Sequence, residues 1–349
     1  MTIELRIASS EDGTEWDRII SESPHGTLFH HWDWLKITEK HTRTTLFPLI
    51  GIKDNTAIGV FPLFLQKKGI VRMVFSPPAH ASILSLGPVL AAYDTIKQEK
   101  REMNYIGFQN LVEDFISHEL QAQYISISLP PALQDPRPFS WSGYTFELQY
   151  DYIVDLSIGL ESLFQTLDKN GRQNIRRAKK RGISVEVGGK NECEKIFDLM
   201  VDRYAEQGKN VSESRQYYSE IYDCFRDYLK IFVAKSEGEI ISGCIDFHYR
   251  GTHFSWIGNP KPKKPVSPSP NDLLIWESVR YAHDHGCRYY VTMNAAGDKR
   301  LHSYYVSKFN PKLKAHFSVK KNSWLAGLLE TGYSNVVKPF RGRFRKMFQ

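Results

Sequence analysis

The chain has 349 residues, of which 41% are hydrophobic and 13% aromatic. This length is sufficient for two domains of ordinary size, and the composition excludes a disordered or low-complexity protein. The formal net charge of +7 favours anionic partners such as nucleic acid, phosphorylated small molecules or an anionic membrane surface.

Two absences in the sequence shape the expected environment. The segment 1–6 lacks the apolar core of a signal peptide, and no apolar run approaches the roughly 20 residues that span a bilayer. The four cysteines form no CxxC pair, and the histidines form no HExxH pattern. We therefore expect a cytoplasmic protein with reduced thiols and no bound metal.

The predicted elements occur twice in the same order. In the first half they are helices at 11–22 and 32–39, a hairpin of strands 45–52 and 57–65, a helix at 108–122 and a strand at 124–129. In the second half they are a helix at 192–205, a hairpin of strands 229–234 and 239–248, a helix at 272–285 and a strand at 289–293. Each hairpin has a glycine early in its second strand, Gly59 and Gly243. The repetition predicts two mixed α/β domains of similar fold, with a boundary near 149–152.

Between the two copies lies a dense cationic segment. Seven Lys or Arg residues occur between Lys169 and Arg181, with no acidic residue among them. Arg172, Arg176 and Lys180 recur at helical i, i+4, i+8 spacing, so a helix would place them on one face. Gly182 is placed to end this helix, and 183–187 is typical of a strand. The helix either binds a polyanion or is a solvated basic face.

Several segments, taken in order, resemble the FemAB-like group of tandem GNAT acyltransferases. That group builds the interpeptide bridges of peptidoglycan precursors, and relatives act on envelope polysaccharides. The resemblance implies an α/β fold with mixed sheets, in which two tandem GNAT-like domains, 1–150 and 151–322, enclose a cleft. A basic, partly apolar tail at 323–349 would follow. The similar segments are 23–27, 32–36, 152–156, 172–182, 213–218, 231–238 with Gly243, 270–276, 286–293 and 305–309.

The resemblance also implies roles for individual residues. Lys36 and Arg215 would bind the phosphate of the acceptor from the two domains, and Arg suits a diphosphate because its planar fork donates two hydrogen bonds. Lys308 would stabilise the oxyanion that develops during acyl transfer or would bind an anionic donor group. Trp34 and Tyr304, which lie close to these lysines in the sequence, would contact the substrate.

Other candidates follow from the residues themselves. Asn294 and Asp298 lie where the predicted strand 289–293 ends, and loops in such places commonly carry chemistry. Asp298 would take a proton from the acceptor amine, or it is a solvated turn residue. Asp246 is an acid within an apolar strand and would act as a general base if its face of the sheet lines the cleft. Trp256 is either a core residue or a platform for the ligand.

The sequence leaves two candidates for the acyl donor, aminoacyl-tRNA and acyl-CoA. Acetyl-CoA enzymes of this fold usually have an Arg/Gln-x-x-Gly-x-Gly/Ala turn before a helix, and 258–270 contains none. This absence favours aminoacyl-tRNA over acyl-CoA as the donor, with no other cofactor. The expected function is therefore transfer of an aminoacyl or acyl group to an amine of a phosphate-bearing, lipid-linked or soluble cell-envelope precursor.

Two alternatives remain. One is an acyl-CoA-dependent N- or O-acyltransferase of surface polysaccharide biosynthesis. The other is a non-catalytic protein that binds nucleic acid or a membrane surface. The tail supports the last possibility, because 338–348 interleaves basic and aromatic residues as interfacial segments do. A peripheral position on the inner face of the membrane is therefore a further expectation.

Overall fold

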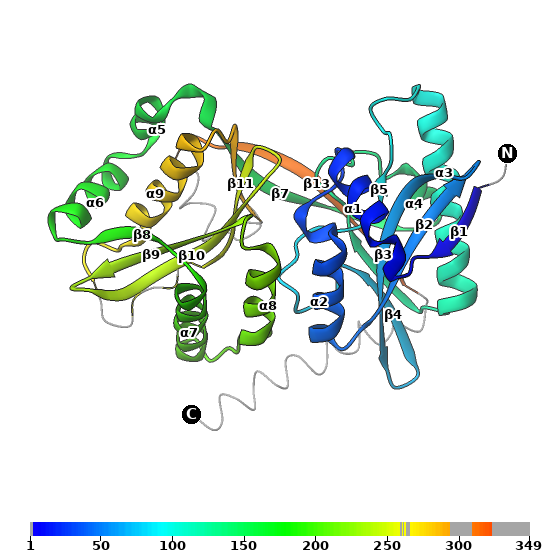
Figure 1. Cartoon of the computed structure of the whole chain (residues 1–349), viewed down its shortest axis with the longest axis horizontal. Helices are drawn as coiled ribbons and strands as arrows, with labels where there is room; N and C mark the ends of the chain where they lie inside the picture. Colours follow the sequence, from blue (N-terminus) through cyan, green and yellow to red (C-terminus); the bar gives the residue numbers. More distant parts are fainter. Residues whose placement is uncertain (1–2, 259, 261, 263–265, 294–308, 323–349) are drawn as a thin grey trace. The chain divides into compact units, whose positions relative to one another are not determined.

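The computed structural model describes residues 3–258, 260, 262, 266–293 and 309–322. The chain divides into two compact units, which are described separately (Figure 1). Unit 1 comprises Met1–Ala79, Ser85–Leu148 and His316–Gln349, and unit 2 comprises His80–Leu84 and Gln149–Ala315. Unit 2 therefore includes a five-residue segment from the first half of the chain. The sequence pattern gives no sign of this insertion.

Unit 1 contains a mixed sheet with the strand order β1-β2-β3-β4-β6-β13, and the short strand β5 pairs with β3. The β4–β6 pair is parallel, and the other pairs are antiparallel. The strands are β1 (Ile3–Ile7), β2 (Thr45–Lys53), β3 (Thr56–Lys68), β4 (Val71–Ser76), β5 (Val89–Leu90), β6 (Tyr124–Ser128) and β13 (Lys312–Asn322), of which the part from His316 on belongs to unit 1. The helices are α1 (Gly13–Glu22), α2 (Trp32–Thr42), α3 (Gln98–Asp114) with a π-helical turn at Phe115–Leu120, and α4 (Arg137–Trp141).

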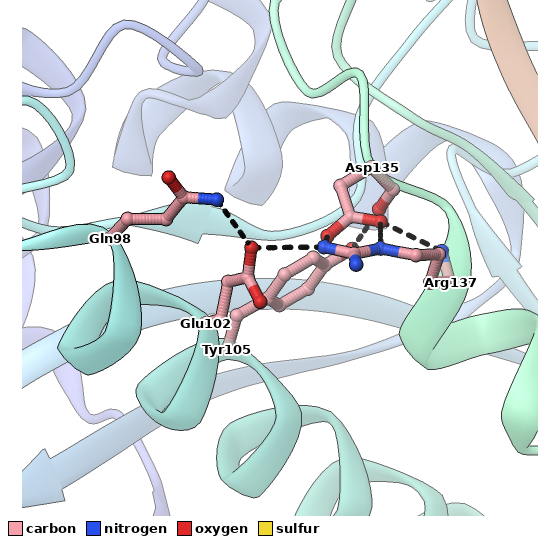
Figure 2. A network of polar contacts seen from close by, with 5 residues as sticks. All are labelled: Gln98, Glu102, Tyr105, Asp135 and Arg137. Atoms are coloured by element: carbon pink, nitrogen blue, oxygen red, sulfur yellow. Dashed lines mark hydrogen bonds and ion pairs between the residues drawn. The ribbon is translucent and has the colours of Figure 1, made fainter.

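The core of unit 1 forms where α3 packs on the sheet. Phe108 and Val112 of α3 and Phe61 and Leu63 of β3 are fully buried there. A polar network fixes the loop before α4 to α3, as Figure 2 shows. Arg137 donates to Asp135 at 2.8 Å and to Glu102 at 3.1 Å. This exposed network is a structural link, and it contains none of the residues predicted to act on a substrate.

The strands of unit 2 follow the order β7-β12-β11-β10-β9-β8 and are also of mixed direction. The β11–β12 pair is parallel, and the other pairs are antiparallel. The strands are β7 (Thr145–Asp155, from Gln149 on), β8 (Ser184–Gly188), β9 (Leu229–Ser236), β10 (Glu239–Tyr249), β11 (Thr252–Gly258) and β12 (Tyr289–Thr292). The helices are α5 (Leu160–Thr166), α6 (Lys169–Lys180), α7 (Lys190–Glu206), α8 (Arg215–Phe225) and α9 (Asn271–Asp284).

The helices of unit 2 lie on both faces of its sheet (Figure 1). Helix α9, with α6 beside it, covers one face of β9 and β10, and α7, with α8 beside it, covers the other. Side chains alternate between the faces of a strand, so successive residues of β10 face opposite helices. Gly243 faces α7, whereas Cys244 and Asp246 lie on the side of α9.

The predicted mixed α/β class is confirmed, and both predicted hairpins are present as β2–β3 and β9–β10. Helix α3 begins ten residues before the predicted start at 108, because its first turns are polar and lack an apolar period. Strands β1, β4, β5, β7, β11 and β13 and helices α4, α5 and α8 have no counterpart among the predicted elements. No helix in the described ranges is both long enough and apolar enough to cross a lipid bilayer.

Candidate functional site

The two unit 1 residues predicted to bind substrate lie on α2. Lys36 forms an ion pair with Glu39 one turn later, and the other carboxylate oxygen of Glu39 accepts the backbone N–H of Leu46 at 2.8 Å. Trp34 is fully buried, and its ring packs edge-on against Phe29 at 5.1 Å between centroids. Lys36 is thus accessible, whereas Trp34 belongs to the interior of unit 1.

Arg215 is the first residue of α8 in unit 2. Its guanidinium pairs with Asp198 and lies 3.8 Å from a carboxylate oxygen of Glu194, both on α7. The same group lies over the ring of Phe197. Two carboxylates therefore already face this arginine, and a phosphate ligand would have to compete with them.

The described residues leave out four of the predicted positions. Asn294, Asp298, Tyr304 and Lys308 lie outside the described ranges, and their proposed contacts with substrate remain predictions. No group of three or more His, Cys, Asp or Glu side chains in the described ranges is placed to hold a metal ion.

Asp246 lies in a closed polar cluster between β10 and α9. The carboxylate oxygen Oδ2 accepts Ser278 Oγ–H at 2.5 Å and lies 3.0 Å from His253 Nε2. All three side chains are fully buried. The neighbouring Cys244 thiol lies 3.5 Å from Oδ2, and burial, followed by the charge of Asp246, raises the pKa of this thiol. A carboxylate enclosed in this way suits a structural hydrogen-bonding role better than that of a general base.

Trp256 lies on the opposite face of the same strands. Its indole Nε1–H donates to the carbonyl of Ser82 at 2.6 Å, and its ring packs against Tyr218 with centroids 5.8 Å apart. Tyr217 Oη–H donates to the carbonyl of Ala81 at 2.7 Å. These aromatic residues fix the inserted segment His80–Leu84 onto unit 2.

A carboxylate and two hydroxyl groups meet beside Trp256. Glu213 Oε1 accepts Ser82 Oγ–H at 2.6 Å, and Tyr218 Oη lies 3.1 Å from Ser82 Oγ. Burial, together with the charge of Glu213, raises the pKa of the Tyr218 hydroxyl above its usual value. Tyr218 therefore stays protonated at neutral pH and can donate. Sequence reasoning missed this cluster because Ser82 precedes Glu213 by 131 residues.

The predicted cationic helix is confirmed as α6. Asp168 caps its start by accepting the N–H of Gly171 at 2.6 Å, and Gly182 follows its end with φ of 76°. Ile175 and Ala178 are buried on the inner side of α6. The helix packs on α9, where Lys179 pairs with the largely buried Glu277 at 2.8 Å.

The three α6 residues predicted to bind a polyanion differ in their surroundings. Arg172 donates to the carbonyls of Gln165 and Leu167, and Arg176 lies over the ring of Phe164. Lys180 is exposed and has no ion pair with any described residue. The same is true of three further cations. On α6 and at its C-cap, the exposed cations without an ion pair to a described residue are Lys169, Arg177, Lys180 and Arg181.

Part of unit 2 is similar to a known protein family. Residues 168–300 match the model of the family described as "Acetyltransferase (GNAT) domain". This stretch contains α6 to β12, so the match to the family falls within unit 2. The predicted likeness to FemAB-type acyltransferases is supported by the solved structures described next.

Three solved structures share the fold over almost the whole chain. The crystal structure of FemX is 14% identical and covers 90% of this chain and 96% of its own, with a TM-score of 0.66. A lysylphosphatidylglycerol synthetase C-terminal domain from Agrobacterium fabrum is 13% identical and covers 93% and 98%, with a TM-score of 0.54. A tandem GNAT protein from the clavulanic acid biosynthesis pathway is 13% identical and covers 91% and 98%, with a TM-score of 0.54.

At these identities the likeness establishes the fold, and the predicted tandem GNAT architecture is confirmed. No curated protein sequence matches the chain.

Proposed function

We propose that the protein transfers an aminoacyl or acyl group to an amine of a phosphate-bearing cell-envelope precursor. The observation that carries this proposal is the cationic surface of α6 within the GNAT domain. Four exposed cations without a described ion-pair partner are suited to a phosphate-rich ligand, because each phosphate contact releases condensed counterions. The names of two similar structures, FemX and lysylphosphatidylglycerol synthetase, agree with an acceptor of this class.

Catalysis in this proposal comes mainly from placing the acceptor amine against the donor carbonyl and from stabilising the resulting oxyanion. Lys308 stays the predicted oxyanion stabiliser, and Lys36 and Arg215 stay the predicted phosphate contacts. The donor proposed is aminoacyl-tRNA, since a tRNA backbone would match the charge of α6. The same charge suits the cytoplasmic face of an anionic membrane, and a peripheral position there is part of the proposal.

The first experiment identifies the ligands that copurify with the native protein by mass spectrometry. Bound tRNA or a nucleotide-linked precursor supports the proposal, whereas bound CoA favours the polysaccharide acyltransferase. Transfer assays with aminoacyl-tRNA and with acyl-CoA as alternative donors then measure the reaction directly. Nucleic acid bound without any acyl transfer would contradict the proposal.

The second experiment tests α6. Arg172 and Arg176 already have intramolecular contacts, so the sharper variant changes Arg177, Lys180 and Arg181 to Gln, which keeps good helix formers. We expect weaker binding of tRNA, with the slope of log K against log salt shallower by about 2 to 3. A matched control removes three exposed cations on and near α7 and α8, Lys195, Lys209 and Arg226. Equal effects of the two triple variants would show that only net charge matters and that α6 is not the binding surface.

A further inference from the structure

Glu213 of unit 2 is a half-buried carboxylate without a cationic partner in the described part of the chain. Its two oxygens accept hydroxyl groups, Ser82 Oγ–H at 2.6 Å and Ser212 Oγ–H at 2.7 Å. Arg215, only two residues away, is turned instead to Asp198 and Glu194. A carboxylate that is partly removed from water and has no counterion among the described residues is suited to bind a positively charged ligand.

The hydrogen bonds around Glu213 all run toward the carboxylate. Ser82 has a single hydroxyl proton, and this proton is committed to Glu213 because a carboxylate only accepts. Tyr218 Oη is then the donor across its 3.1 Å contact with Ser82 Oγ. Two hydroxyls occupy only part of the roughly four lone-pair positions of an ionised carboxylate. Acceptor positions therefore remain for the N–H groups of a ligand.

Aromatic rings hold this arrangement in place on one side. Tyr218 and Trp256 are only 3% and 8% exposed, and Trp256 fixes the backbone of Ser82 through its indole N–H. Ser82 itself has φ of 49°, a left-handed conformation that residues other than glycine seldom adopt. The surrounding contacts maintain this conformation, and it places the serine hydroxyl at the carboxylate. The rings also lower the local dielectric, which strengthens an ion pair at Glu213.

We propose that Glu213, Ser82, Tyr218 and Trp256 form a binding subsite for a primary ammonium group. The inference rests on the proposed function, in which an amine is acylated. A primary ammonium has three N–H donors and matches the remaining acceptor positions of Glu213. The group would come from one of two sources, the amine of the acceptor or the α-amine of an aminoacyl donor.

Calorimetry on the full chain tests the subsite without requiring acyl transfer. The acceptor amine is represented by Nα-acetyl-lysine amide and the donor amine by L-alanine methyl ester. Nα-acetyl-norleucine amide is the neutral counterpart of the lysine probe. We expect the ammonium probes to bind, the neutral probe to bind at least tenfold more weakly, and the tighter of the two ammonium probes to identify the source.

Three variants locate the binding. Glu213→Gln should weaken the ammonium probe at least tenfold, and Ser82→Ala should weaken it by a smaller factor because the carboxylate stays. The matched control Glu220→Gln removes the same charge from α8, where Glu220 accepts a hydrogen bond from Gln216 at 2.9 Å, and should leave affinity unchanged. Equal binding by wild type and Glu213→Gln, or equal binding of the charged and neutral probes, overturns the subsite. Absence of acyl transfer by the wild type, with probe binding intact, would instead overturn the proposed function.

Discussion

Gly59 and Gly243, one in each hairpin, lie where a helix side chain packs closely against the strand. A Cβ at Gly243 would lie 2.5 Å from Ile196 of α7 and 2.8 Å from the carbonyl of Phe232, and a Cβ at Gly59 would lie 3.1 Å from Phe108 of α3. In each unit a helix side chain thus occupies the space above the glycine. The glycine repetition seen in the sequence has its physical reason in this close approach.

We predict that Gly243→Ala lowers the free energy of unfolding by about 1–3 kcal/mol, the usual cost of overpacking a core. Urea denaturation measures the change. Adding Ile196→Ala should restore part of the loss relative to the sum of the two single variants, because the shortened side chain no longer occupies that space. Strict additivity of the two variants would contradict the explanation by steric contact.

Arg215 supports a prediction about the acceptor. Removal of the guanidinium by Arg215→Ala should weaken binding of a nucleotide-linked acceptor by about 1.5–3 kcal/mol, the scale of a charged hydrogen bond. Asp198→Asn releases Arg215 from its closest carboxylate and should leave acceptor binding equal or tighter. Titration calorimetry compares the variants. If Arg215→Ala binds the acceptor like the wild type, this arginine serves only to join α7 and α8.

At the scale of elements, the start of α6 depends on one side chain. Asp168→Ala removes the hydrogen bond to the N–H of Gly171 and should destabilise the protein by about 1 kcal/mol. Asn170→Ala changes an exposed residue of the same turn and should have little effect. Chemical denaturation followed by circular dichroism measures both. A loss no larger for Asp168→Ala than for Asn170→Ala would show that the cap contributes nothing.

The elements predicted correctly are those with local signals. The cationic run and Gly182 indicate α6, and the polar turns between apolar runs indicate the two hairpins. Helix α8 also has a local signal. Ser214 caps it, and Tyr218, Ile221 and Phe225 follow at helical spacing. Strand β13 pairs with β6, nearly 200 residues earlier, and a contact of that range leaves little local trace.

In the candidate site, too, single residues could be predicted from local sequence, whereas their long-range contacts could not. Single residues such as Asp246, Trp256 and Arg215 stand out from their neighbours in the sequence, and the structure adds what surrounds each one. The burial of Asp246 with His253 and Ser278, and the meeting of Ser82 with Glu213, depend on strands and helices far apart in the chain. No spacing rule connects such residues, so their grouping required the fold.

At the scale of the whole molecule, buried histidines set the response to acid. Burial, with a smaller contribution from the Arg101 charge, lowers the pKa of His25 to about 4, and burial lowers the pKa of His30 to about 3. The unfolded chain takes up protons near the ordinary histidine pKa of about 6.5, while the folded chain does not. Stability is therefore present above that pH and falls as the pH drops toward the folded pKa values.

We predict that acidification from pH 7 to pH 5 lowers the free energy of unfolding by about 2 kcal/mol for each of these two histidines. The carboxylates with lowered pKa, such as Asp12 paired with Arg6, lose their contribution only below about pH 4 and do not act in this window. Urea unfolding at pH 7, 6 and 5 and constant ionic strength measures how steeply the free energy of unfolding depends on pH.

His118→Gln, which changes an exposed histidine, should keep the pH dependence of the wild type. His30→Gln should reduce this pH dependence, since only the neutral side chain is compatible with the buried site. A stability that stays constant between pH 7 and pH 5 would show that these histidines titrate equally in both states.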